Sequence, residues 1–248
     1  DPEMSRGLGD VYKRQGVIAA IVICALVGVL VELVAYRPVR RKGTSMSALI
    51  TAIAMSLLLE NLAQASPAMG PNPRVISDEI FSTAPMSLGG VSVNMAAVIT
   101  IVIAAVVMAA LQIFVQKTKL GRAMRAVSEN KEASTLVGIN VNRTIVTTFA
   151  IGSGLAAIAA LMYCAQYHTV TTTMGSMLGL KAFVAAVMGG IGLIPGAMLG
   201  GIVVGIIEAL VTAYISSSLA NAVVFLILIV MLLVKPAGIL GKNVGEKV

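Results

Sequence analysis

The run VNMAAVITIVIAAVVMAALQIFVQ (residues 93–116) is apolar almost throughout and contains no charged side chain. It matches the ~20 residues that a helix needs to cross a bilayer. Backbone polar groups in lipid must be paired within the protein, and a helix pairs them locally. The run is continuous and far longer than the alternating strands of an outer-membrane barrel. It therefore predicts a membrane-spanning helix.

Six further apolar segments resemble this run. The seven segments lie at 16–36, 45–64, 93–116, 144–163, 179–194, 196–215 and 220–235. Hydrophobic residues make up 58% of the 248 residues and charged residues only 12%, whereas a soluble domain has about 25% charged residues. We expect an all-α fold, a polytopic integral membrane helix bundle with about seven transmembrane segments.

The first fifteen residues, DPEMSRGLGDVYKRQ, are polar and differ abruptly from the apolar sequence that begins at Gly16. They lack the apolar core of a signal peptide. The DVYKRQ end is typical of translated sequencing-adapter read-through. We therefore interpret residues 1–15 as a non-native leader and residues 16–248 as the transmembrane domain, and we expect the natural N-terminus to be missing.

Lysine and arginine are distributed unevenly between the connections, which predicts the orientation of the chain. With seven spans threaded, one side receives Arg74 and Lys181, apart from the three basic residues of the leader. The other side receives Arg37, Arg40, Arg41, Lys42, Lys117, Lys119, Arg122, Arg125, Lys131, Arg143, Lys235, Lys242 and Lys247. The loop at 117–143 and the C-terminus are therefore expected to be cytoplasmic, and the loop at 65–92 external.

A charged island, GRAMRAVSENKEASTLVGIN (Gly121–Asn140), lies inside the loop at 117–143. Read as one helix, it places Arg122, Arg125, Glu129 and Glu132 on a single stripe. A short amphipathic helix at the membrane surface suits docking to a soluble partner. This island is the first candidate functional site.

A second unusual segment is GGIGLIPGAMLGG (residues 189–201), which is rich in glycine. Small residues at four-residue spacing let helices approach closely in lipid. Together with Pro195, they predict a broken or tightly turned helix pair. Helix packing is the favoured interpretation, and lining a substrate route is the alternative. The residues concerned are Gly192, Pro195, Gly196 and Gly200.

Three carboxylates lie within the apolar segments, where charge is costly and indicates function. Glu32 is near the predicted cytoplasmic end of its span, where it can pair with Arg37 or extend to the membrane surface. Glu60, with Asn61, lies near the outer end of its span and can reach water. Glu208 lies deepest and is the best candidate for a polar lining or an interhelical bond. For all three carboxylates, a structural bond is favoured over contact with a substrate.

The chain carries no signature of nucleotide hydrolysis or of cofactor or metal binding. The P-loop pattern, HExxH and GxSxG are all absent, and the two cysteines lie in or beside different apolar runs. The net charge of +7 follows from the topology rule rather than from nucleic-acid binding. We expect no cofactor, no metal and no catalytic residue. A secondary transporter would need coupling residues near mid-membrane, and only Glu208 approaches that role.

Four segments carry a resemblance to a known family. They are ELVAYRPVRRKGTSMSALITAIAMSLLLEN, GRAMRAVSENKEASTLVGINVNRTIVTTFAIGSGLAAIAALMY, GLKAFVAAVMGGIGLIPGAMLGGIVVGIIEAL and KPAGILG. In this order they resemble a branched-chain amino acid ABC transporter permease, the member of the permease pair that carries AYRPVR. Glu132-Ala133-Ser134 followed by Gly138 is similar to the EAA-x-x-x-G pattern of importer permeases, with Ser in place of the second Ala.

The resemblance implies a permease subunit in the plasma membrane of a bacterium or archaeon. Its partners would be a second permease subunit, two ATP-binding subunits and an external substrate-binding protein that delivers leucine, isoleucine or valine. Related permeases carry urea, short-chain amides or sugars, which is the alternative. Lys181 could attract a substrate carboxylate, although an interfacial lysine is the favoured interpretation. The residues expected to couple to the ATPase are Gly121, Arg122, Arg125, Glu129, Glu132, Ala133 and Gly138.

Overall fold

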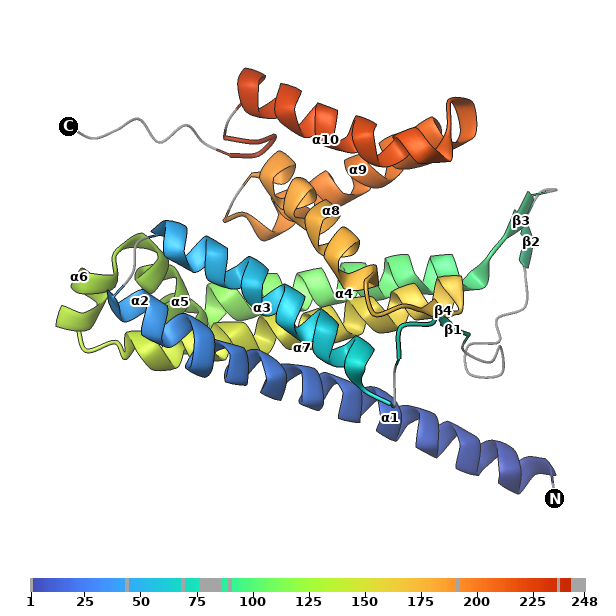
Figure 1. The fold of residues 1–248 in the computed structure, drawn as a ribbon, viewed down its shortest axis with the longest axis horizontal. Coiled ribbons are helices and arrows are strands. Elements are labelled where there is room, and N and C mark those ends of the chain that lie inside the picture. The colour runs from blue at the N-terminus through green and yellow to red at the C-terminus, as the bar shows by residue number, and fades with distance from the viewer. Residues whose placement is uncertain are drawn as a thin grey trace. The chain divides into compact units, whose positions relative to one another are not determined.

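A computed structural model gives the fold drawn in Figure 1. It describes residues 2–42, 45–67, 70–75, 86–88, 91–190, 192–235 and 237–241. The helices are α1 (Pro2–Val31), the π-helix η1 (Glu32–Tyr36), α2 (Arg37–Lys42), α3 (Ser45–Ala65), α4 (Met95–Lys117), α5 (Lys119–Glu129), α6 (Lys131–Leu136), α7 (Val141–Tyr167), α8 (Met174–Gly189), α9 (Ile194–Tyr214) and α10 (Ser217–Val234). The short strands are β1 (Arg74–Val75), β2 (Met86–Leu88), β3 (Val91–Val93) and β4 (Thr169–Val170).

The chain divides into two compact units. The first contains Asp1–Ile103 and Phe114–Thr172, and the second contains Ala104–Ile113 and Thr173–Val248. The polar helices α5 and α6 belong to the first unit, and the glycine-rich helices α8 and α9 belong to the second.

Helices α1 and α7 form the main packing of the first unit and run antiparallel. Gly28 of α1 lies so close to Ser153 of α7 that a Cβ at position 28 would overlap the serine side chain. Further along the chain, the rings of Tyr36 and Phe149 lie with centroids 5.0 Å apart. Small residues thus allow the two helices to approach closely, as is typical of helices in lipid.

Contacts between the connections show how the spans of the first unit alternate. Strand β1 pairs antiparallel with β4, with Arg74 opposite Val170. The connection after α3 and the connection after α7 therefore lie at the same end. At the other end of α7, Asn142 accepts a hydrogen bond from Arg40 of α2 over 3.0 Å. For α3 and α7, the connections before and after the helix thus lie at opposite ends.

The second unit is a bundle of α8, α9 and α10 around a small apolar core. Its buried residues are Val184, Ala185, Met188, Val204 and Val224. These helices are apolar on nearly all sides, which is typical of membrane spans rather than of soluble amphipathic helices. Close approaches of α8 and α9 occur at glycines, described below.

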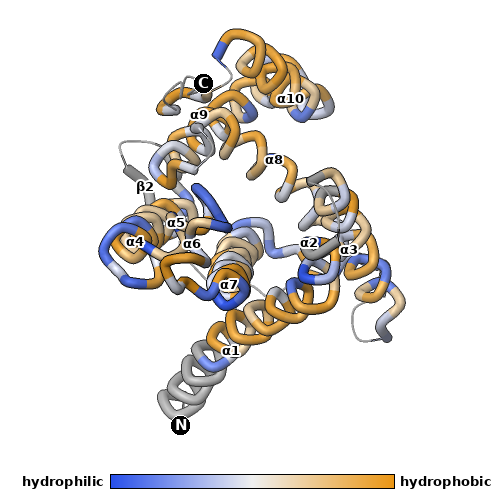
Figure 2. The backbone as a smooth tube through the Cα atoms, turned by 90° about the vertical axis from the view of Figure 1, so that its left-hand side faces the viewer, coloured by the Kyte–Doolittle hydropathy of each residue, from blue (hydrophilic) through white to orange (hydrophobic). Residues whose placement is uncertain are grey.

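The prediction of an all-α polytopic membrane bundle is confirmed. Six helices among the described residues are long and apolar enough to cross a membrane: Gln15–Arg40, Met46–Ala65, Met95–Lys117, Val141–Tyr167, Ile194–Tyr214 and Ser217–Val234. The seventh predicted segment corresponds to α8, a shorter apolar helix of 16 residues, or about 24 Å. Figure 2 shows hydrophobic residues along the long helices and hydrophilic residues gathered in the connections.

Two predicted boundaries differ from the structure. The segment predicted at 179–194 is wrong at its end, because α8 ends at Gly189 and α9 begins at Ile194. The sequence between the two helices is apolar, so hydropathy gives no sign that α8 ends there. The first segment was expected to begin at Gly16, whereas α1 is helical from Pro2 onward. The C-terminal residues 242–248 and most of the loop at 76–90 lie outside the described residues.

Candidate functional site

The turn from α4 into α5 is fixed by Thr118 and Gly121. The Thr118 hydroxyl accepts a hydrogen bond from the Gly121 amide over 3.0 Å and donates one to the Phe114 carbonyl over 2.7 Å. Gly121 is buried, and a Cβ there would overlap the main chain of Phe114 and Val115. Main chain cannot move aside as a flexible side chain can, so only glycine fits. The start of α5 is thereby held against the end of α4.

The charged island forms two helices rather than one. Helix α5 ends at Glu129, and Asn130 is extended, with φ −152° and ψ 114°. The Asn130 Oδ1 accepts hydrogen bonds from the amides of Glu132 (2.9 Å) and Ala133 (3.0 Å), and so caps α6. The predicted single stripe from Arg122 to Glu132 is therefore wrong, because an asparagine that binds the following amides stops one helix and starts the next.

The turn from α6 into α7 depends on Gly138. The Gly138 amide donates to the Thr135 carbonyl over 3.1 Å, and the Ile139 amide to the Ser134 carbonyl over 3.0 Å. This pair of bonds is a Schellman motif, which needs a left-handed residue. Gly138 supplies it with φ +83° and no atom near its missing Cβ. The next helix, α7, is capped by Asn140, whose Oδ1 accepts from the Arg143 amide over 3.0 Å.

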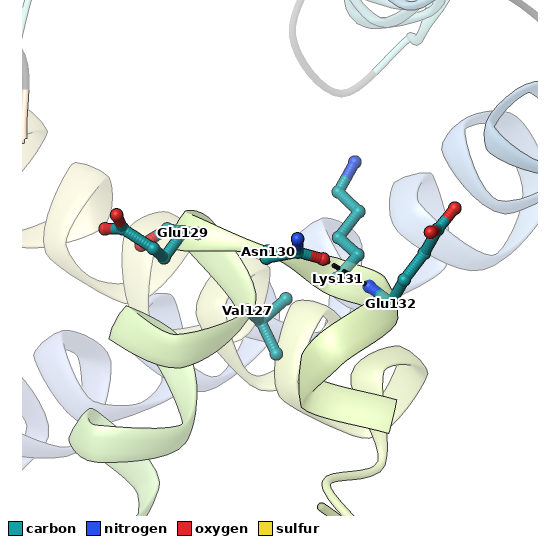
Figure 3. A pocket seen from close by; sticks show the side chains of 6 residues that line it. Val127, Glu129, Asn130, Lys131 and Glu132 are labelled. Atoms are coloured by element: carbon teal, nitrogen blue, oxygen red, sulfur yellow. Dashed lines mark hydrogen bonds between the residues drawn. The ribbon is translucent and has the colours of Figure 1, made fainter. Parts of the chain in front are cut away.

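Residues 127–132 line an open groove of about 370 Å³ where α5 meets α6. Figure 3 shows Val127 lying between the two helices, while Glu129, Lys131 and Glu132 extend outward from them. The groove is thus lined mainly by polar and charged residues, with one apolar residue, Val127. Beyond it, two large apolar residues at the end of α6 are highly exposed, Leu136 at 89% and Val137 at 75%.

Buried side chains hold this helix pair on the rest of the first unit. Val127 of α5, Ser134 of α6 and Thr144 of α7 are all buried. The Ser134 hydroxyl donates to the Asn130 carbonyl over 2.7 Å, and the Thr144 hydroxyl to the Asn140 carbonyl over 3.0 Å. Both buried hydroxyls are therefore satisfied locally, which buried polar groups require.

The structure brings the predicted coupling residues into one region, the polar helix pair (α5 and α6) with the turn that follows. Gly121 is buried at its start, and the others are at its surface. The exposed or partly exposed members are Arg122, Arg125, Glu129, Glu132, Ala133 and Gly138. Arg125 is tied back to α4, since its guanidinium donates to the Gln116 carbonyl over 3.3 Å.

A second polar cluster lies at the same end of the first unit, around Glu32. Glu32 is fully buried, and its carboxylate lies 2.9 Å from the guanidinium of Arg40. The predicted partner, Arg37, is therefore wrong. The backbone between these residues is also unusual, and Pro38 explains why. Proline has no amide to donate to the carbonyl four residues earlier, and its ring would clash with that carbonyl. The chain widens into the π-helix η1, in which the Arg37 amide donates to the Glu32 carbonyl instead.

Lys181 and Glu208 form an ion pair between α8 and α9. The Lys181 Nζ lies 2.6 Å from Glu208 Oε1, and the side chains are 20% and 35% exposed. The ion pair is the interhelical bond that was one of the two interpretations of Glu208. The two other polar candidates of the spans lie on α3, where Asn61 donates to the Leu57 carbonyl of its own helix over 2.7 Å and Glu60 is half-buried.

The turn between α8 and α9 contains the glycine-rich candidates. Gly192 has φ +91°, and Pro195 lies in the first turn of α9, where proline is favoured because its amide would have no partner. Gly196 and Gly200 are buried against the main chain of α8. A Cβ at Gly200 would overlap the Ala185 carbonyl. All four residues therefore fit a tight helix hairpin.

Sequence reasoning missed the two residues that organise the polar regions. Asn130 is a favoured N-cap residue with an acidic residue, Glu132, in the turn that follows, but the helical spacing of the charges outweighed this signal. Arg40 was counted only among the basic residues that set orientation, because its contacts with Glu32 and Asn142 are distant in sequence. Among the described residues, no group of three or more His, Cys, Asp or Glu side chains could hold a metal ion.

Comparison with known proteins identifies the family. Residues 15–234 match the family described as branched-chain amino acid transport system, permease component. The high-affinity branched-chain amino acid transport system permease protein BraD of Pseudomonas aeruginosa is 40% identical over 233 residues, 93% of this chain and 75% of BraD. The corresponding protein LivH of Escherichia coli K12 is 42% identical over 248 residues, 97% of this chain and 78% of LivH.

A more distant similarity is shorter. The xylose transport system permease protein XylH of Escherichia coli K12 is 36% identical over 90 residues, 34% of this chain and 23% of XylH. No solved structure matches the chain. The family match covers most of the residues, including all six candidate spans among the described residues, so this chain belongs to the permease components of branched-chain amino acid transport systems.

Proposed function

We propose that the chain is the membrane-spanning permease subunit of an ATP-driven importer that moves leucine, isoleucine and valine. The observation that carries this proposal is the polar helix pair, an exposed and charged surface held rigidly between two spans, in a chain of this family. The chain has no nucleotide-binding signature of its own. ATP is therefore hydrolysed by two partner subunits, and a second permease subunit completes the membrane portion.

The polar helix pair is the contact for the ATP-binding subunits. A contact that transmits motion must be stiff, and each junction here is fixed by a side-chain cap: Thr118, Asn130 and Asn140. The exposed Leu136 and Val137 supply an apolar centre next to the charged residues 129–132. An apolar centre with a polar rim is typical of protein interfaces.

The orientation of the chain follows from its basic residues. The polar helix pair and the C-terminus face the cytoplasm, because the connections there carry most of the lysine and arginine. The connections at the opposite end of the first unit, which include β1 and β4, face the external binding protein. Residues 16–248 form the permease domain, because the family match begins at residue 15.

The partial similarity to XylH makes sugar the competing substrate class. The test is uptake into proteoliposomes that contain the assembled transporter, its binding protein and internal ATP. We expect uptake of radiolabelled leucine that unlabelled isoleucine and valine suppress and that xylose and urea leave unchanged. ATP-dependent uptake of xylose or urea, with no leucine uptake, would contradict the proposed substrate class.

Two variants test the coupling role in the same vesicles. Glu132→Lys reverses a charge at the edge of the groove, and Gly138→Asp forces a side chain onto a left-handed position. Both are expected to lower leucine uptake while the partner subunits still hydrolyse ATP. If both variants import leucine as fast as the unaltered transporter, the polar helix pair does not couple ATP hydrolysis to transport.

A further inference from the structure

The interface between α8 and α9 is an apolar stripe with one interruption, the ion pair of Lys181 and Glu208. On α9, the buried residues Gly196, Gly200, Val204 and Val211 follow one another at helical spacing. On α8, the buried residues are Val184, Ala185, Val187, Met188 and Gly189. Lys181 continues the stripe of α8 by one turn, and Glu208 lies at the edge of the stripe of α9. The ion pair is therefore part of the helix interface rather than of the outer surface.

The pair lies well inside the spans. Lys181 is about two turns from the start of α8 at Met174, and Glu208 is about two turns from the end of α9 at Tyr214, or about 10 Å in each case. A charged side chain at such a depth is costly and faces the bundle interior or a water-filled cavity. Apolar residues of similar volume would hold two helices together as well or better. Packing alone therefore gives no reason for a lysine and a glutamate at these positions.

The exposed side of the Lys181–Glu208 ion pair does not lie on the face of α9 that carries large apolar side chains. The exposed apolar residues Ile202, Ile206 and Leu210 lie on another face of the helix. Glu208 shares its face with three small exposed residues, Gly201, Gly205 and Thr212. A Cβ at Gly205 would meet no atom within 4 Å. The ion pair thus borders open space beside a strip of small residues, and it remains 20% to 35% exposed there.

We infer that Lys181 and Glu208 bind the zwitterionic head group of the transported amino acid. The inference rests on the proposed function and assigns the substrate-contacting residues of that importer. An α-amino acid carries an ammonium and a carboxylate on one carbon, which matches a lysine and a glutamate held side by side. The substrate carboxylate pairs with the Lys181 ammonium, and the substrate ammonium pairs with the Glu208 carboxylate.

Exchange of partners keeps every charge compensated. Without substrate, Lys181 and Glu208 neutralise each other over 2.6 Å, so neither is left as an isolated charge within the spans. With substrate, each exchanges its partner for the opposite charge of the zwitterion, and the net charge of the site stays zero. The apolar side chain of the amino acid then lies along the small residues Gly201 and Gly205, which leave room for it.

The test uses the assembled transporter in proteoliposomes with saturating, leucine-loaded binding protein. The main variant is Lys181→Met with Glu208→Gln, which removes both charges and leaves neither unpaired. A second variant, Lys181→Glu with Glu208→Lys, keeps an ion pair but reverses its direction. Thr100→Val is the control, because the Thr100 hydroxyl bonds only to the Ala96 carbonyl of its own helix over 2.8 Å among the described residues. Co-purification with the partner subunits is measured for each variant to verify assembly.

We expect both double variants to assemble and to import leucine at least tenfold more slowly than the unaltered transporter, with the control unchanged. The reversed pair stays slow because it binds the zwitterion in the opposite sense and turns the substrate side chain away from Gly201 and Gly205. Leucine uptake within twofold of the unaltered rate in either double variant would show that the ion pair only joins the two helices. That result would overturn the inference. If the unaltered transporter imports no leucine, the proposed function itself fails, which is a distinct result.

Discussion

The polar helix pair (α5 and α6) and the glycine hairpin (α8 and α9) both contain glycines that the structure requires, but for opposite reasons. Gly138 has a backbone conformation that other residues avoid, with open space around it. Gly200 has ordinary helical geometry, but its missing side chain makes room for the main chain of α8. The first kind of glycine is needed for a bend and the second for a close contact. Substitutions should therefore cause local strain in one region and loss of helix packing in the other.

The largest effect is expected at Gly200. Gly200→Ala places a methyl group on the Ala185 carbonyl, and main chain cannot yield, so overpacking should destabilise the second unit by about 3 kcal/mol or more. Gly205→Ala is the matched control on the same helix, since a Cβ there meets nothing within 4 Å. Thermal unfolding in detergent micelles measures both. Equal stability of the two variants would contradict the close α8–α9 contact.

The second largest effect is expected at Arg40, at the same end of the first unit as the polar helix pair. Arg40→Met leaves the Glu32 carboxylate buried without its ion-pair partner, which should cost about 3 kcal/mol. Adding Glu32→Gln should recover much of that loss, because it removes the unpaired charge. The same unfolding measurement applies. A single variant as stable as the double variant would show that the ion pair contributes nothing.

A smaller effect is expected at Gly138. Gly138→Val should cost about 1–2 kcal/mol, because a residue with a Cβ is strained at φ +83°. Gly138→Asn should cost less, since asparagine tolerates the left-handed region. Leucine uptake should follow the same order, with the asparagine variant the more active. If both variants lose the same amount of stability and uptake, the effect at this position comes from the size of the added side chain rather than from the backbone conformation.

The smallest effect is expected at Asn130. Asn130→Ala removes both hydrogen bonds to the first amides of α6 and should cost about 1 kcal/mol. Asn130→Asp keeps an acceptor at the same place and should remain close to the unaltered protein. Hydrogen exchange at the Glu132 and Ala133 amides reports the difference directly. Unchanged protection in the alanine variant would mean that the cap does not hold α6.

Much of the fold could be predicted because hydropathy in a membrane chain is a strong and local signal. The long helices α3, α4, α7, α9 and α10 follow predicted apolar segments closely. The failures have a common physical cause, since they occur where the deciding interaction is not hydropathy. The sequence between α8 and α9 is apolar, and the positive φ of the C-cap Gly190 ends α8 without any polar residue.

The site was harder to predict than the fold. The charge spacing of the island suggested one helix, because side-chain periodicity is visible in sequence while a cap at Asn130 competes with it locally. The pairs Glu32–Arg40 and Lys181–Glu208 each join residues on different helical elements. Sequence alone identified Glu32, Lys181 and Glu208 as unusual charges, but their partners depend on how the helices pack.

The most direct measurement of the central claim is capture of the ATP-binding subunits by the assembled permease pair. Glu132→Lys reverses a charge beside the groove of the polar helix pair, and Arg74→Glu reverses one in β1, at the opposite end of the first unit. We expect co-purification to be weakened by Glu132→Lys and unchanged by Arg74→Glu. Capture unaffected by Glu132→Lys, or no capture by the unaltered permease despite correct membrane insertion, would contradict the role of the polar helix pair as the contact for the ATPase.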